Sequence, residues 1–106
     1  MDAVSIRNDI VDRVLKIYPE ATRILLFGSR ARGTDHPDSD FDLLVVAESE
    51  LAPARRAALL HLALRDLSEA FDIIVATQDE FERNLAWRSS IIFTAATEGA
   101  ILYEAA

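Results

Sequence analysis

Two short segments of this chain are apolar at nearly every position, and both begin with the residues Phe-Asp. The sequence FDLLVVA occupies positions 41–47, and FDIIVAT occupies positions 71–77. Strands with such continuous apolar runs are typical of sheets that are buried on both faces. The chain is therefore expected to fold around a sheet on which helices pack.

Local patterns predict elements on either side of the first of these strands. Apolar residues recur every three or four positions near the start of the chain, which predicts an amphipathic helix that ends before Pro19; they are Ile6, Ile10, Val14, Ile17 and Tyr18. The run RILLF (23–27) predicts a strand that ends at Gly28. Residues 28–39 are rich in Gly, Ser, Asp and Pro, which predicts a loop, with room for one helical turn after Ser29.

The second half of the chain carries further helix signals. Pro53 suits the start of a helix, whose buried face is predicted to contain Leu60, Ala63, Leu64, Leu67 and Phe71. Thr77 and Glu80 have the spacing of a capping box that opens another helix. The segment SSIIFTAATEG (89–99) is predicted to be a helix ended by Gly99, and AILYE (100–104) a short strand. The predicted fold class is α/β or α+β, in a single domain over residues 1–106.

Composition narrows the possible functions. The 106 residues include 11 basic and 18 acidic side chains, for a net charge of −7. This balance argues against a simple nucleic-acid-binding module, because phosphate backbones attract Lys and Arg. It is compatible with metal ions or a basic protein partner. The lack of cysteine excludes disulfides and thiolate metal sites and fits a reducing cytoplasm. We identify neither a signal peptide nor a membrane span.

Two familiar motifs are nearly matched between the first two predicted strands, and both fail. GSRARGTD has the glycine spacing of a phosphate-binding P-loop, but Thr34 stands where the lysine belongs. DSDFD resembles the start of a calcium loop, but Leu43 replaces the turn glycine and Ser49 the final glutamate.

What remains is Gly28-Ser29, ten intervening residues, and Asp40-x-Asp42 at the start of a strand. Side chains two residues apart on a strand share a face, so Asp40 and Asp42 can reach the same cation. Asp72 begins another buried strand and could join them. Hard cations such as Mg²⁺ prefer carboxylate oxygens and complete their shell with substrate phosphates. The alternatives are an ordinary turn-to-strand junction for the pair and a loop-capping role for Asp72.

Gly28 and Ser29 supply groups suited to phosphate. Glycine allows a ligand to approach the backbone closely, and Ser29 offers an N–H and a hydroxyl. Arg30 could contact a triphosphate, and Arg32 is a weaker candidate. The alternatives are a simple turn residue for Ser29 and surface ion pairs for the two arginines.

The segment GSRARGTDHPDSDFDLLV resembles the G-S-x10-D-x-D signature of the nucleotidyltransferase superfamily that includes DNA polymerase beta. More narrowly, the chain is similar to the minimal nucleotidyltransferases. The resemblance implies a mixed sheet of three to four strands flanked by helices. It assigns metal binding and catalysis to Asp40, Asp42 and Asp72, and nucleotide binding to Gly28 and Ser29.

The resemblance also implies a reaction and a partner. Such proteins often act as antitoxins of HEPN-domain ribonuclease toxins, by transferring AMP from ATP to a toxin tyrosine with two Mg²⁺ ions. On this basis we expect a cytoplasmic Mg²⁺-dependent enzyme with a toxin partner and no direct contact to nucleic acid. Two alternatives remain: neutralisation of the toxin by stoichiometric binding, and nucleotidyl transfer to RNA or a small molecule.

A single domain of this size has little room to hold an acceptor, so we expect another protein to present it. The exposed parts of NLAWRSSIIF (84–93) are candidate contacts, since aromatic and arginine side chains are enriched at interfaces. The alternative is that Trp87, Ile91 and Ile92 belong to the core.

Overall fold

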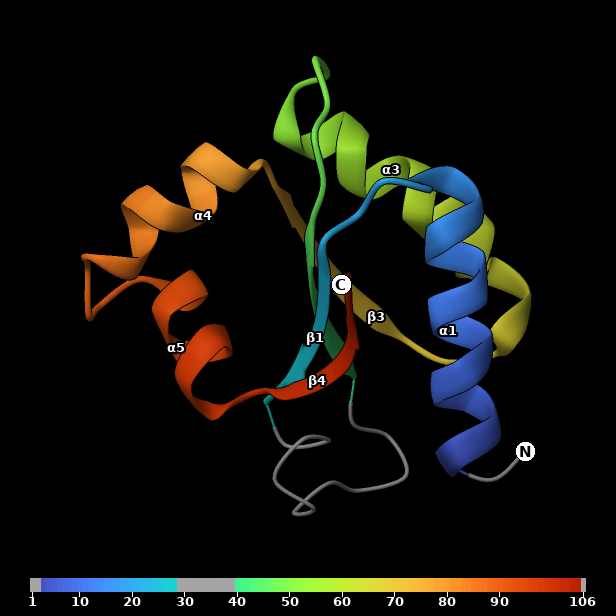
Figure 1. Ribbon diagram of the computed structural model, residues 1–106. Helices are drawn as coiled ribbons and strands as arrows, with labels where there is room; N and C mark the ends of the chain where they lie inside the picture. The colour runs from blue at the N-terminus through green and yellow to red at the C-terminus, as the bar shows by residue number, and fades with distance from the viewer. Residues whose placement is uncertain (1–2, 29–39, 106) are drawn as a thin grey trace.

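The computed structural model describes residues 3–28 and 40–105, which fold into helices packed around a sheet (Figure 1). The helices are α1 (Ala3–Ile17), α3 (Pro53–Leu64), α4 (Gln78–Leu85) and α5 (Ile91–Glu98), and a 3-10 helix, η1 (Arg65–Leu67), follows α3. The strands are β1 (Arg23–Phe27), β2 (Phe41–Val46), β3 (Phe71–Ala76) and β4 (Ala100–Glu104). Within these described ranges, none of the helices combines the length and the hydropathy needed to cross a bilayer.

The described strands form one mixed sheet in the order β3-β2-β1-β4. β1 is antiparallel to both of its neighbours, β2 and β4, whereas β2 and β3 run parallel. The parallel pair requires a crossover, which α3 and η1 supply. The predicted class, a mixed sheet flanked by helices, is confirmed.

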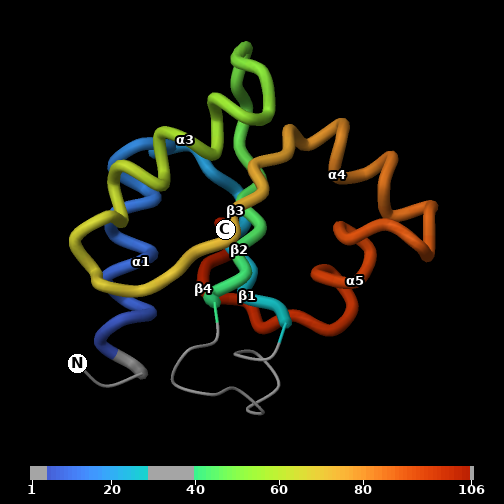
Figure 2. Tube along the Cα trace, turned by 180° about the vertical axis from the view of Figure 1, so that it is seen from behind, coloured from blue at the N-terminus to red at the C-terminus, as the bar shows by residue number. Residues whose placement is uncertain are grey.

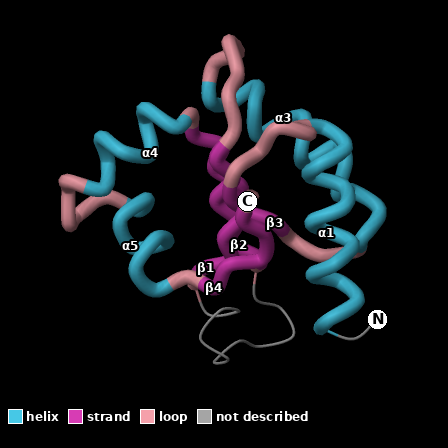
Figure 3. Tube along the Cα trace, viewed as in Figure 1, coloured by secondary structure: helices cyan, strands magenta, loops and turns pink. Residues whose placement is uncertain are grey.

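Helices cover both faces of this sheet, as Figures 2 and 3 show. α1 and α3 pack on one face, where the buried residues include Ile10, Val14, Ile24, Leu26, Leu43, Val45, Leu60, Leu64 and Val75. α4 and α5 pack on the other face, around Leu25, Phe27, Leu44, Val46, Ala76, Phe81, Ile92 and Ala95. Alternate residues of β1, β2 and β3 therefore enter different cores, which explains why these strands are apolar at consecutive positions.

Most predicted boundaries agree with the structure. The strand at 23–27 is confirmed, and those predicted at 41–47 and 71–77 each end one residue earlier. Both capping-box hydrogen bonds are present at the start of α4, and α5 ends at Gly99 before β4 as predicted. The predicted loop at 28–39, with its possible helical turn, lies outside the described residues beyond Gly28.

Two predictions about buried side chains were wrong. Ile17 is 39% exposed, because α1 ends there and the next residue, Tyr18, takes the buried position. The Tyr18 hydroxyl donates to the Arg56 carbonyl at 2.9 Å. Phe71 was predicted both on the buried face of the helix that starts at Pro53 and at the start of a strand. It is the first residue of β3, because α3 ends at Leu64 and η1 follows it.

A buried arginine joins the two helical layers at one end of the sheet. Arg56 of α3 is 6% exposed and donates to the carbonyls of Leu51 at 2.7 Å and Val75 at 3.2 Å. Its Nη1 also donates to Oε1 of Glu80 at 2.6 Å, and the same oxygen accepts the Thr77 N–H at 2.8 Å. The ion pair therefore fixes α3, the end of β3 and the start of α4 together.

We expect Arg56→Ala to lower the free energy of unfolding by about 3 kcal/mol, because the change leaves Glu80 and two carbonyls without their charged donor. Chemical denaturation measures this loss. Arg83→Ala is the matched control: its ion pair with Asp79 is exposed and should contribute less than about 1 kcal/mol. Equal losses in the two variants would contradict the role assigned to Arg56.

The same pair predicts a dependence on pH. The hydrogen bond from Arg56, followed by the Thr77 N–H, lowers the pKa of Glu80. Its stabilising contribution is therefore complete above the ordinary glutamate pKa of about 4.3 and is lost as the pH falls through the folded-state value. Below about pH 4.3, wild-type stability should fall more steeply than that of Glu80→Gln. Parallel stability curves would argue against this linkage.

Candidate functional site

Asp42 and Asp72 are direct neighbours on the parallel strands β2 and β3. The strand register pairs Asp42 with Asp72 on one side and with Phe27 of β1 on the other. Paired residues of adjacent strands lie about 5 Å apart and project to the same face. That face is the one covered by α4 and α5, because Asp42 alternates with Phe41 and Leu43 of the opposite core. The sheet thus brings together two carboxylates 30 residues apart in the sequence.

The phenylalanine before each aspartate fixes this arrangement from the other face. Phe41 and Phe71 are also paired in the register, and their rings stack with centroids 5.5 Å apart. The Phe41 N–H donates to the Ala70 carbonyl at 2.9 Å. The two Phe-Asp dipeptides therefore stack their rings on one side of the sheet and align their carboxylates on the other. Sequence reasoning expected that Asp72 could join the other aspartates, but it missed the pairing of the phenylalanines, although the repeated dipeptide was its signal.

Gly28 makes room for the Asp42 carboxylate. It follows the last residue of β1 and has a φ of +73°, a conformation that glycine adopts readily. A Cβ atom placed on Gly28 would lie 2.1 Å from Oδ2 of Asp42. The carboxylate therefore occupies the space that any other residue would fill at position 28. This contact gives a physical reason for the glycine of the Gly-Ser motif.

The structure places the other predicted site residues less completely. Asp40 directly precedes β2 and is exposed. Ser29 and Arg30 lie outside the described residues, so their predicted roles stay predictions. Over residues 3–28 and 40–105, no three acidic or histidine side chains gather closely enough to hold a metal ion. The closest arrangement to the predicted three-carboxylate site is the aligned pair, Asp42 and Asp72.

The donor chemistry of this pair fits a divalent cation. Asp42 is half-buried and Asp72 exposed, so one carboxylate is fixed in the sheet and the other faces the solvent. Two aligned negative charges repel each other, and a cation between them relieves that repulsion. Their oxygens are the hard ligands that Mg²⁺ prefers.

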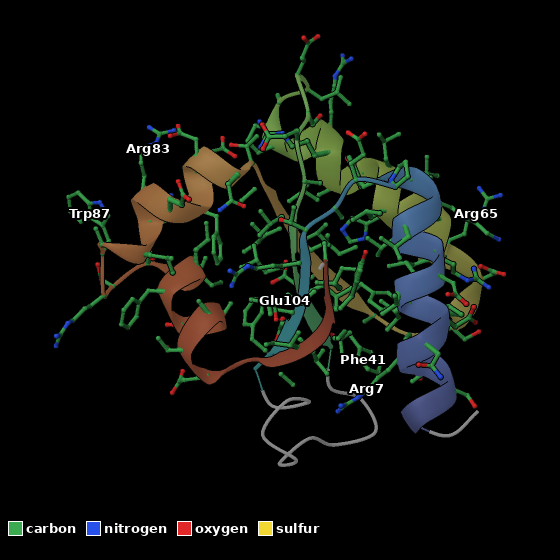
Figure 4. The ribbon with its side chains drawn as sticks, viewed as in Figure 1. Arg7, Phe41, Arg65, Arg83, Trp87 and Glu104 are labelled. Atoms are coloured by element: carbon green, nitrogen blue, oxygen red, sulfur yellow. The ribbon has the colours of Figure 1, made fainter. Side chains whose placement is uncertain are left out.

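Besides the aspartates, the described surface carries an arginine at the same end of the sheet and two hollows elsewhere. Figure 4 shows Arg7 of α1 at the same end of the sheet as Phe41, so a cationic side chain also lies at this end. Two hollows lie away from the aspartates. One, of about 340 Å³, is lined by Asp9, Asp12, Arg13, Lys16, Ile17 and Ala63. The other, of about 420 Å³, is lined by Ile17, Tyr18, Pro19, Glu20, Ala21, Ala47 and Glu48. Neither hollow contains Asp42 or Asp72.

The sequence matches a known protein-family model that spans the candidate site. The family model described as a nucleotidyltransferase domain matches residues 7–99, a range that includes Gly28, Asp42 and Asp72. Among curated proteins, no sequence matches significantly.

Solved structures with a similar fold cover nearly the whole chain. One is a toxin–antitoxin complex with AMP-PNP, 25% identical, with a TM-score of 0.70 over 93% of this chain and 73% of the other. Another is a candidate nucleotidyltransferase from Sulfolobus solfataricus, 24% identical, with a TM-score of 0.63 over 92% and 78% of the two chains. A third is a complex of a tri-AMPylated Shewanella oneidensis HEPN toxin with its MNT antitoxin, 22% identical, with a TM-score of 0.61 over 93% and 70%.

The contact between Gly28 and Asp42 gives a direct test of the site. We expect Gly28→Ala to weaken Mn²⁺ binding at least about tenfold, because the added methyl group displaces a carboxylate from its position. Calorimetric titration with Mn²⁺ measures the change, and circular dichroism verifies that the variant is folded. Unchanged Mn²⁺ affinity in a folded variant would show that position 28 does not organise the site.

Proposed function

The chain belongs to the nucleotidyltransferase domain family, and from this premise we propose that it transfers AMP from ATP to a tyrosine hydroxyl of a HEPN-domain toxin. Transfer of AMP would block the toxin, so the chain would act as its antitoxin in the cytoplasm. The observation that carries the proposal is the alignment of Asp42 with Asp72 beside Gly28, at the end of the sheet where β2 and β3 begin.

The proposed reaction requires a bound cation, and carboxylates held in place by paired strands can bind one. The acceptor oxygen forms a bond to the α-phosphorus of ATP, the bond from that phosphorus to the bridging oxygen breaks, and pyrophosphate leaves. Asp40, Asp42 and Asp72 would hold Mg²⁺, which when bound stabilises charge on the attacking and leaving oxygens. The exposed carboxylate of Asp72 is suited to accept the proton of the acceptor hydroxyl. Gly28, Ser29 and Arg30 would hold the phosphates of ATP.

The nucleotide and the acceptor in this proposal are chosen from solved structures with a similar fold. The 25% identical structure is a toxin–antitoxin complex that contains AMP-PNP, an analogue of ATP. The complex from Shewanella oneidensis contains a HEPN toxin that carries AMP. The proposal extends these two properties to this chain, whose matched family and aligned carboxylates suit the same chemistry.

The test is Asp42→Asn, which keeps the shape of the side chain and removes its charge. Incubation with ATP, Mg²⁺ and a HEPN-domain toxin should label that toxin with AMP, visible in its intact mass. We expect Asp42→Asn to reduce the labelling rate at least about 100-fold, because the charge that holds the cation is lost. Asp79→Asn, on the exposed surface of α4, is the matched control and should label normally.

Neutralisation of the toxin in cells separates this proposal from simple binding. Under the proposal, Asp42→Asn fails to protect cells from the toxin although the variant folds normally. Full protection by this variant, without AMP on the toxin, would instead identify the chain as an antitoxin that acts by stoichiometric binding.

A further inference from the structure

The turn between α4 and α5 carries large apolar side chains on its outer surface. Trp87 is 66% exposed, Ile91 51% and Leu85 36%. Figure 4 shows Trp87 at the outer end of α4, pointing away from the sheet. Ile92, by contrast, is buried against the sheet. Of the three residues that the sequence left open between core and interface, Ile92 therefore belongs to the core, whereas Trp87 and Ile91 lie on the surface. This surface, formed by Leu85, Trp87, Arg88 and Ile91, is called the α4–α5 surface.

Hydrogen bonds hold this turn in one conformation. The Ser90 hydroxyl donates to the Asn84 carbonyl at 2.9 Å and accepts the Phe93 N–H at 3.0 Å, which caps α5. The Trp87 N–H donates to the Asn84 carbonyl at 3.1 Å, and the Ser90 N–H donates to the Trp87 carbonyl at 3.0 Å. The indole is thus exposed on an ordered turn. Because the backbone of this turn is already ordered, little backbone entropy is lost when a partner binds.

The charge of this surface differs from that of the rest of the chain. Residues 83–97 contain no acidic residue, although the whole chain has 18 acidic and 11 basic side chains. Of the two arginines in this segment, Arg83 pairs with Asp79 of α4, so the exposed Arg88 supplies the positive charge of the α4–α5 surface. A complementary protein would present an apolar hollow flanked by carboxylates.

Helix α5 connects this surface to the candidate site. It runs from Ile91 to Glu98, a rise of about 12 Å. It ends at Gly99, which packs so closely on β1 that an added Cβ would lie 3.0 Å from the Leu26 carbonyl oxygen. Leu26 is two residues from Gly28, so α5 leads from the α4–α5 surface to the end of β1 that adjoins Gly28. Figure 1 shows α5 between the outer turn and this end of the sheet.

We infer that the α4–α5 surface docks the protein that presents the acceptor hydroxyl, through an apolar hollow flanked by carboxylates on that protein. The identity of the partner rests on the proposed function, whereas the location and chemistry of the surface rest on this structure. Docking at one end of α5 orients the partner so that its acceptor segment can reach Asp42 and Asp72 at the other end.

The test compares two exposed apolar residues on opposite helical layers. Trp87→Ser removes the main side chain of the α4–α5 surface, and Leu62→Ser removes a 60% exposed leucine of α3, the helix that packs on the other face of the sheet. The dissociation constant for a HEPN-domain toxin is measured calorimetrically without ATP. We expect Trp87→Ser to weaken binding at least about tenfold, as for a central interface tryptophan, and Leu62→Ser to change it less than about twofold.

Further measurements separate this inference from the proposed function. Asp42→Asn should bind the partner like the wild type and fail only in AMP transfer. If the wild-type complex forms and Trp87→Ser weakens it but no AMP is transferred, the docking inference stands and the proposed function fails. Unchanged affinity in Trp87→Ser, or equal losses in both serine variants, overturns the inference. Sedimentation of the chain alone overturns it as well if the wild type is a dimer that Trp87→Ser dissociates, because the surface then binds a second copy.

Discussion

The parallel pairing of β2 with β3 is the constraint on which the site depends. It places Phe41 beside Phe71 and Asp42 beside Asp72, so a single register decides both the packing on one face and the charge on the other. A shift by one residue would put the rings on the charged face and the carboxylates into the core that α1 and α3 cover. Hydrophobic packing therefore supplies the free energy that keeps two like charges together.

The rest of the fold secures this register. The crossover through α3 allows β3 to run parallel to β2, and the ion pair of Arg56 with Glu80 closes the opposite end of the sheet. At the charged end, Gly28 leaves space for the Asp42 carboxylate. The contacts that secure the register therefore lie on both sides of the carboxylates: the stacked rings on the opposite face of the sheet, and the ion pair at its opposite end.

Much of this fold could be predicted from the sequence because its signals are local. The capping box of Thr77 and Glu80, the stop at Gly99 and the doubly buried strands all follow from residues close together in the chain. Local patterns make no prediction, or a wrong one, where contacts with a distant segment decide the outcome. Burial of Arg56 depends on carbonyls of Leu51 and Val75 and on Glu80, which no local pattern brings together. The exposure of Ile17 likewise follows from how α1 ends and Tyr18 packs.

For the site, the sequence by itself determined which chemical groups are present: a Gly-Ser turn, a D-x-D segment and a third aspartate that opens a similar strand. It also determined that both strands are buried, since their apolar runs need two covered faces. Only the tertiary structure decided that Asp72 lies beside Asp42, because strand register is a contact between segments 30 residues apart. It likewise decided that Ile92 is buried while Trp87 and Ile91 are exposed, because the hydrogen-bonded turn at Ser90 directs one side chain inward and the others outward.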